Sequence, residues 1–272
     1  MNYRVSHLWS PIVVICISTL LSGCNIMSSN KSPEEQFQLS LTGLAGIEAL
    51  SFNGEAALRR NEQRWFEHHF TYEGQLTEHD LLSMQTQLSL QSSSSNIENK
   101  QSDNSSLVST DLRRIQGGWV RTSAVENEVD QALARFNPLR QLEGIAGLRK
   151  SIQEEAGASR GTRVLRIELN PEDALNWLES ELSSELASLN PQSDSSYHPE
   201  VQLELEAIWK QGEEQLQTML QHANVSTVYH LTIERKSYFP LRLTSESNML
   251  YLDADNNEQS ETMVEDVVFN RN

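Results

Sequence analysis

The chain has 272 residues, which is enough for one large domain or two small ones with a substantial hydrophobic core. It carries 38 acidic and 21 basic residues, and its formal net charge of −17 disfavours binding to nucleic-acid phosphates or anionic lipid headgroups. With only two cysteines, the chain is not held together by a framework of several disulfide bonds.

The N-terminal residues have the pattern of a secretory signal. Arg4 precedes an apolar stretch at 8–21, which is short for a bilayer span and has the length of a signal-peptide core. This stretch ends in an apolar residue, two small residues and a cysteine, a sequence that resembles the bacterial lipobox: Leu21-Ser22-Gly23-Cys24.

The lipobox resemblance implies that the chain is cut before Cys24 and that the Cys24 thiol takes a diacylglycerol. We therefore expect a signal peptide at 1–23 and a lipidated tether at 24–32. The anchored protein would face outside the cytoplasm, on a Gram-positive surface or on either Gram-negative membrane. The alternative is a buried N-terminal helix with an incidental cysteine.

Four proline residues mark predicted helix starts. Ser32 is suited to a helix N-cap, and each of the four prolines precedes apolar residues at helical spacing. The four pairs are Ser32-Pro33, Asn137-Pro138, Asn170-Pro171 and His198-Pro199. The acidic residues between the apolar positions predict solvated helix faces rather than functional sites.

Alternating apolar and polar residues predict strands on both sides of the helical middle. The strands are expected at 51–58, 64–76, 80–90, 108–115, 119–122, 163–169, 227–235, 241–252 and 262–270. A serine-rich segment at 91–106 has almost no apolar residues and predicts a flexible surface loop. One antiparallel sheet closing around helices, in a single domain at 33–272, accounts for this order.

The order of elements, together with three short patterns, resembles the lipoprotein-carrier half-barrel superfamily, which includes LolA-like carriers and LppX-like lipoproteins. The patterns are SFNGEA at 51–56, NPLRQL at 137–142 and YHLTIERKSYFPLR at 229–242. The resemblance implies an α+β fold, in which a strongly curved antiparallel sheet, or half-barrel, carries helices on its concave face. In members of the superfamily that carry lipid, acyl chains lie between the sheet and the helices.

A cavity between sheet and helices would be lined by apolar side chains. The helix beginning at Pro199 has the longest apolar stripe, and we expect it to cross the concave face with Trp209 at its middle. The expected lining residues are Phe66, Phe70, Tyr72, Trp209, Met219, Tyr229, Leu231 and Ile233. The same aromatic residues are equally suited to a filled core, and periodicity does not distinguish the two.

No catalytic, cofactor-binding or metal-binding motif is recognised. His68 and His69 are adjacent on a strand and point to opposite faces, so they do not chelate one ion together. The run Asp253-Ala254-Asp255-Asn256-Asn257 departs from the EF-hand pattern and predicts a hairpin turn.

The leading hypothesis is a non-catalytic envelope lipoprotein that binds an apolar or amphiphilic ligand such as a lipid, with no cofactor and no nucleic-acid partner. The second is a protein-interaction or sensory domain with a filled core, and the third is a hydrolase. A hollow interior favours the first hypothesis over the second.

Overall fold

The computed structural model describes residues 31–61, 63, 65–89, 105–122, 128–191 and 198–271. The chain divides into two units, Met1–Ser32 and Pro33–Asn272, and every described helix and strand belongs to the second. The predicted signal peptide, Cys24 and residues 91–104 of the predicted loop lie outside the described residues. No helix in the described part of the chain is long and apolar enough to cross a bilayer.

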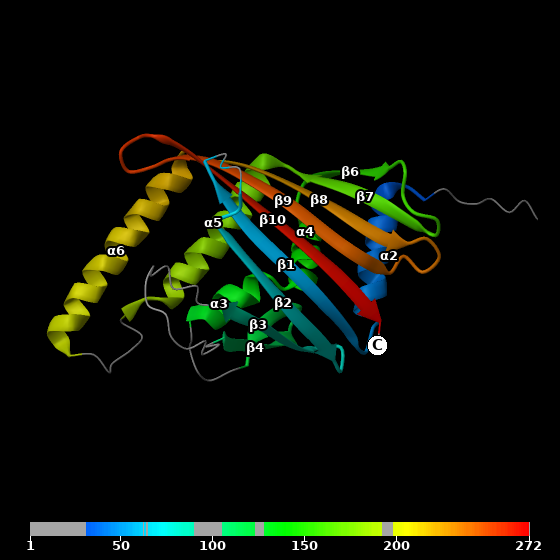
Figure 1. Ribbon diagram of the computed structural model, residues 1–272, viewed down its shortest axis with the longest axis horizontal. Helices are drawn as coiled ribbons and strands as arrows, with labels where there is room; N and C mark the ends of the chain where they lie inside the picture. The colour runs from blue at the N-terminus through cyan, green and yellow to red at the C-terminus, as the bar shows by residue number, and fades with distance from the viewer. Residues whose placement is uncertain are drawn as a thin grey trace, which may run out of the picture. The chain divides into compact units, whose positions relative to one another are not determined.

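Ten strands of this unit form one antiparallel sheet, with helices packed on one of its faces (Figure 1). The spatial order is β5-β4-β3-β2-β1-β10-β9-β8-β7-β6, so β5 and β6 form open edges and the described strands do not close into a barrel. The strands are β1 (Leu50–Arg60), β2 (His68–Thr77), β3 (Leu81–Ser89), β4 (Ser105–Ile115), β5 (Gly118–Arg121), β6 (Lys150–Glu155), β7 (Thr162–Leu169), β8 (Asn224–Glu234), β9 (Pro240–Leu252) and β10 (Glu258–Arg271). The predicted α+β half-barrel fold is confirmed.

All four helices predicted from proline starts form. The helices are α2 (Pro33–Ala45), α3 (Glu128–Arg135), α4 (Pro138–Gly147), α5 (Pro171–Ser188) and α6 (Pro199–Gln221). Asn137 accepts hydrogen bonds from the first backbone N–H groups of α4, and Asn170 does the same for α5. At the start of α6, His198 makes no side-chain capping bond, so there the proline alone marks the boundary.

A filled core occupies one half of the inner sheet face. Phe37 from α2 and Leu142 and Ile145 from α4 are completely buried there. The sheet residues that share this core include Leu50, Phe52, Leu165, Ile167, Leu231, Ile233 and Leu243.

Two glycines fix the aromatic rings at the centre of this sheet. Gly54 on β1 pairs with Tyr72 on β2, and Gly74 on β2 pairs with Phe52 on β1. A Cβ at either glycine would lie 2.2 Å from the ring of its partner, so each ring occupies the space of the missing side chain. The Tyr72 ring, and with it the position of its hydroxyl, is thereby held in place.

The position expected for α6 is wrong. This helix was expected to cross the concave face, but it packs mainly against α5 and, on the sheet, mainly against β9. Leu220, in its last turn, is its single buried residue, whereas Leu203 and Ile208 are 67% and 66% exposed. The apolar stripe of α6 is therefore only partly covered within the described domain, and α2, α4 and α5 supply most of the helical side of the core.

Two elements, and the starts of four strands, differ from the prediction. Strand β6 was missed because it is an edge strand in which no residue is fully buried, so its sequence shows little alternation. Helix α3 was missed because it is short and no proline marks its start. Strand β2 begins at His68 rather than at residue 64, and β4 begins at Ser105, within the predicted loop. Strands β8 and β10 begin at Asn224 and Glu258 rather than at residues 227 and 262.

Candidate ligand-binding cavity

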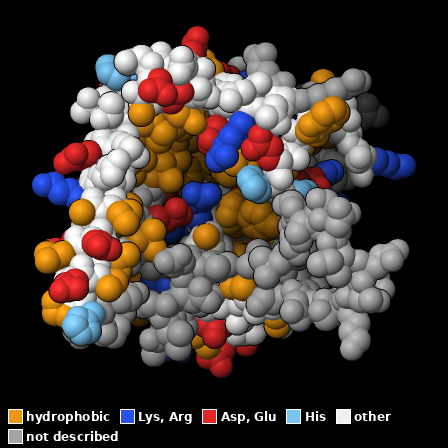
Figure 2. Space-filling model, turned by 60° about the vertical axis from the view of Figure 1, so that its left-hand side comes forward, with side chains coloured by type: hydrophobic (Ala, Val, Ile, Leu, Met, Phe, Trp, Pro, Cys, Tyr) orange, Lys and Arg blue, Asp and Glu red, His pale blue; other side chains and the backbone are white. Residues whose placement is uncertain are grey.

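The other half of the inner sheet face is hollow. A cavity of about 620 Å³ lies between this half of the sheet and helices α3 to α6. Figure 2 shows the hollow from the side of α6, bordered by hydrophobic side chains with acidic and basic side chains between them. The volume lies within the range of small-molecule pockets in proteins.

The cavity floor consists of three neighbouring rows of side chains that run across the sheet. The first row contains Phe70, Ala56, Glu265, Ser245 and Tyr229, on β2, β1, β10, β9 and β8. The second contains His68, Leu58, Met263, Ser247 and Thr227, and the third contains Glu261, Met249 and Val225. Ala56, Ser245, Ser247 and Thr227 are small residues in the first two rows, and they leave space where large residues fill the other half of the sheet.

Helices form the walls of the cavity, and their contribution is mainly apolar. The lining residues from the helices include Leu133, Phe136, Ala174, Trp177, Leu178, Leu182, Leu216 and Met219. Gly144 on α4 lets α5 approach closely, because a Cβ there would lie 3.0 Å from the Trp177 ring.

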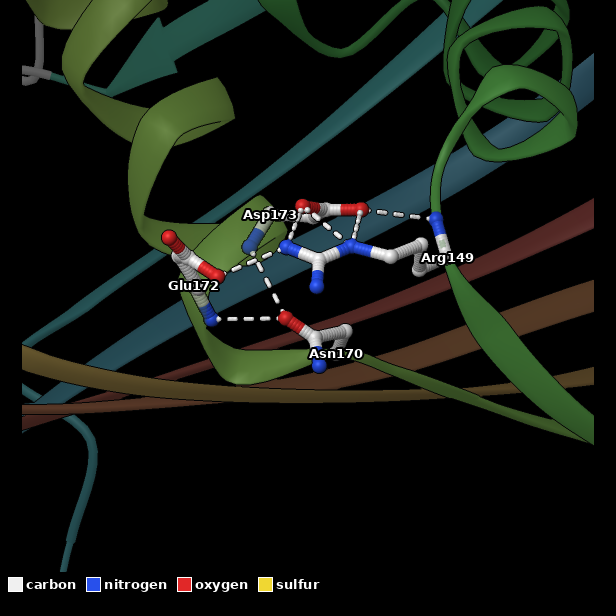
Figure 3. A network of polar contacts seen from close by, with 4 residues as sticks. All are labelled: Arg149, Asn170, Glu172 and Asp173. Atoms are coloured by element: carbon white, nitrogen blue, oxygen red, sulfur yellow. Dashed lines mark hydrogen bonds and ion pairs between the residues drawn. The ribbon is translucent and has the colours of Figure 1, made fainter.

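A polar network fixes the start of α5 (Figure 3). The Arg149 guanidinium, directly before β6, donates to Asp173 at 2.6 Å and to Glu172 at 2.7 Å, and its backbone N–H donates to Asp173 at 2.7 Å. Asn170 caps the same helix, and its backbone N–H donates to the Arg149 carbonyl at 2.8 Å. These bonds tie the helix start to strands β6 and β7 and so position Ala174 and Trp177 at the cavity. The hydrogen bonds from Arg149 lower the pKa of Asp173.

The first row of the floor contains a buried carboxyl group. Glu265 is 5% exposed and accepts hydrogen bonds from the Tyr72 hydroxyl and from Gln141 Nε2, the latter at 2.8 Å. Burial raises the pKa of Glu265 to about 7, although both hydrogen bonds and the charge of Arg135 act in the opposite direction. Burial together with the charge of Glu265 raises the pKa values of Tyr72 and Tyr229.

The raised pKa of Glu265 predicts a dependence of stability on pH. Near and below the ordinary value of 4.5 the carboxyl is protonated in the folded and unfolded chains alike. Between 4.5 and about 7 only the folded chain retains the proton, so the stability that this group contributes is lost as the pH rises through that interval. Glu265→Gln should therefore raise the melting temperature near pH 8 more than near pH 4.5, as measured by circular dichroism. An equal change at both pH values would contradict the raised pKa.

The charged helix residues at the cavity wall are paired with each other. Arg140 donates to Glu181 at 2.7 Å, and Arg135 lies 3.4 Å from Glu185. On the floor, Glu261 accepts a hydrogen bond from Arg60 at 2.9 Å. Among the described carboxylates that line the cavity, Glu265 alone has no cation within ion-pair distance.

The residues predicted to line a cavity separate into three groups. Phe70, Met219 and Tyr229 line the cavity. Tyr72, Leu231 and Ile233 lie in the filled core. The remaining two lie outside both: Phe66 is 43% exposed beside Arg59, and Trp209 donates from Nε1 to the Leu186 carbonyl at 2.7 Å.

Sequence reasoning missed the small and polar residues of the cavity floor. Ala56, Thr227, Ser245 and Ser247 interrupt the apolar face of their strands, but a single sequence does not show that these interruptions align across the sheet. Glu265 left a clearer signal, because it is a charged residue between Met263 and Val267 on the inner face of β10.

The two patterns considered as metal sites have the geometry predicted from sequence. His68 lines the cavity, whereas His69 lies 3.5 Å from Glu55, so the two point apart. Asp253 accepts hydrogen bonds from the backbone N–H groups of Asp255 and Asn257 in a hairpin turn between β9 and β10. In the described part of the chain, no three His, Cys, Asp or Glu residues are grouped to hold a metal ion.

Comparisons with known proteins give structural likenesses. No family model matches the sequence, and no curated protein matches it. The chain is similar in structure to LprF from Mycobacterium bovis, with 10% identity over 88% of this chain and 91% of that one and a TM-score of 0.32. It is also similar to a LolA superfamily protein from Nitrosomonas europaea, with 8% identity over 88% and 93% of the two chains and a TM-score of 0.25.

A third similar structure is described as a putative outer membrane lipoprotein-sorting protein domain from Vibrio parahaemolyticus. Its identity is 10%, over 88% of this chain and 93% of that one, and its TM-score is 0.26. At these identities and TM-scores, the three likenesses carry no argument about what this chain binds.

Proposed function

We propose that this protein is a non-catalytic lipoprotein of the bacterial cell envelope that binds an apolar or amphiphilic ligand, such as a lipid, between its sheet and its helices. The lipid on Cys24 would hold the domain at the membrane, facing outside the cytoplasm. The observation that supports ligand binding is the cavity of about 620 Å³ with a wall of apolar side chains. The same cavity favours this proposal over a protein-interaction domain with a filled core.

The location of Trp177 in the cavity wall offers a direct binding measurement. Bromine atoms quench tryptophan fluorescence on contact, so a dibrominated methyl stearate would report its own entry into the cavity. With the full chain in a phosphatidylcholine nanodisc, the brominated ester should quench tryptophan fluorescence saturably. Nanodiscs that contain membrane-bound N-acetyltryptophan octyl ester serve as the reference for quenching within the bilayer, and the quenching of the protein should exceed it. Most of this quenching should be absent from Trp177→Phe, because Trp177 lines the cavity whereas Trp65 is 69% exposed.

Narrowing the cavity should weaken binding. Ser247 lies in the second row of the floor, on β9, so Ser247→Phe places a ring in the space that the ligand would occupy. We expect the affinity for the brominated ester to fall about tenfold or more, because the ligand loses apolar burial. The matched control is Glu246→Phe, which adds the same ring at the neighbouring exposed position of β9.

Two results would contradict the proposal. One is the absence of saturable quenching in the wild-type chain. The other is an equal affinity of the wild type and Ser247→Phe for the brominated ester, when Ser247→Phe and Glu246→Phe both have the melting temperature of the wild type. A ring in the cavity would then leave the binding site unaffected.

A further inference from the structure

The cavity floor is more polar than an acyl chain requires. Its first two rows contain Glu265, Ser245, Ser247 and Thr227 beside apolar residues. Thr227 and Ser247 satisfy each other with a hydrogen bond of 3.0 Å, so these two hydroxyls are compatible with an apolar neighbour. The carboxyl of Glu265 is a different case, because it is a charged group buried without a cation.

Glu265 stands where the hollow half of the sheet meets the filled half. In the next row towards the core, Gly54, Val267, Leu243 and Leu231 are paired across the strands, and the three apolar residues are at most 1% exposed. In the opposite direction the floor continues to Glu261 and Met249, near the β9–β10 turn. Glu265 therefore lies at the inner end of the cavity floor, and the third row lies towards the hairpin end that Figure 2 brings forward.

The groups that face Glu265 come from four elements. Tyr72 on β2 and Gln141 on α4 donate one hydrogen bond to each carboxyl oxygen. Tyr229 on β8 and Arg135 on α3 interact with it electrostatically. The remaining lone pairs of the two oxygens are free to accept further hydrogen bonds, because a carboxylate has about four acceptor sites.

Gln141 adds a second unsatisfied acceptor beside the carboxyl. Its Nε2 is used by Glu265, but its buried Oε1 has no hydrogen-bond partner in the described part of the chain, and Gln141 lines the cavity. Beside each other, these two acceptor groups favour a ligand that donates hydrogen bonds, and they disfavour a ligand that presents a carboxylate or phosphate. Arg135, which also lines the cavity, is ion-paired with Glu185, although its Nε has no hydrogen-bond partner in the described part of the chain.

We propose that the cavity selects lipophilic ligands whose head donates hydrogen bonds, and that it holds this head against Glu265 and Gln141. An ammonium head is preferred to a hydroxyl head. This inference rests on the proposed function, because it specifies the ligand of the same cavity. The protonated form of Glu265 is compatible with a ligand whose head is a hydroxyl, whereas the carboxylate form pairs with a ligand whose head is an ammonium.

Three ligands with the same chain length test this selectivity. Dodecylamine, dodecanol and dodecanoate would compete with dibrominated methyl stearate for the full chain in phosphatidylcholine nanodiscs near pH 8, with partition into empty nanodiscs subtracted. We expect the amine to displace the ester at a concentration at least about tenfold lower than dodecanoate requires, with the alcohol between them.

Substitution of Glu265 assigns the selectivity to this side chain. Glu265→Gln keeps the shape and one acceptor oxygen but removes the charge, so the preference for amine over dodecanoate should shrink about tenfold while dodecanol binding changes little. Glu265→Asp, which keeps the charge, should retain a preference for the amine. The matched control is Glu258→Gln, which removes the same charge from an exposed position of β10 outside the cavity lining.

The outcomes separate this inference from the proposed function. If the ester binds but all three competitors displace it equally, or if Glu265→Gln leaves the order and spacing of the three unchanged, the inferred selectivity is overturned and ligand binding stands. If the brominated ester does not bind to the wild-type chain, the proposed function fails and the inference fails with it.

Discussion

Replacing Phe37 by alanine should lower the free energy of unfolding by about 3–5 kcal/mol, because it leaves a cavity where a large ring is buried. Phe37 on α2 is 0% exposed and belongs to the filled core under the sheet. For a domain of this size the melting temperature should fall by about 6–20 °C, as measured by circular dichroism on the full chain in nanodiscs.

Two substitutions on α6 serve as controls for Phe37→Ala. Ile208 is 66% exposed, so Ile208→Ala should change the stability by less than about 0.5 kcal/mol. Trp209 is half-buried against α5, and Trp209→Ala should cost clearly less than Phe37→Ala. A larger loss for Trp209→Ala than for Phe37→Ala would restore the sequence-based prediction, in which α6 supplies the helical side of the core.

The second large effect is expected at the N-terminus. Cys24→Ser should abolish lipid attachment completely, because the lipobox resemblance assigns the diacylglycerol to this thiol. Metabolic labelling with an alkyne-tagged palmitate would show the loss as the absence of label on the protein. The domain at 33–272 should stay folded, since every residue of the hydrophobic core lies within it.

Cys16 provides the matched control for this prediction, because it is the only other cysteine of the chain. Cys16→Ser lies within the expected signal peptide and should leave the mature protein labelled to the same extent as the wild type. Label on the Cys24→Ser chain would contradict the lipobox assignment.

The exposed apolar residues of α6 indicate how far this helix contributes to the rest of the domain. Val201, Leu203 and Ile208 are between 46% and 67% exposed on a helix that is otherwise polar and acidic. Because the helix touches the rest of the domain through α5 and the end of β9, most of its length does not depend on the sheet for its position. Substitutions there should affect the core and the cavity less than substitutions in α4 or α5.

Local chemistry in the sequence determined the start of each proline-initiated helix and the position of the turn between β9 and β10. Asn137 and Asn170 with their following prolines act over two or three residues, so their effect is visible without the fold. The turn at Asp253 likewise depends on hydrogen bonds within five residues. Alternation predicted nine of the ten described strands at approximately the correct positions, with late starts for β4, β8 and β10, and it missed the exposed edge strand β6.

Only the tertiary structure decided which part of the inner face is filled and which is hollow. Tyr229, Leu231 and Ile233 alternate on the same face of β8, look equivalent in sequence and are all buried, but of the three only Tyr229 also lines the cavity. The difference comes from the strand register, which places Tyr229 in a row with Ser245, Glu265 and Ala56, and Leu231 in a row with Leu243 and Val267. Whether a position borders empty space depends on the combined volume of residues far apart in the chain, and no local pattern records that sum.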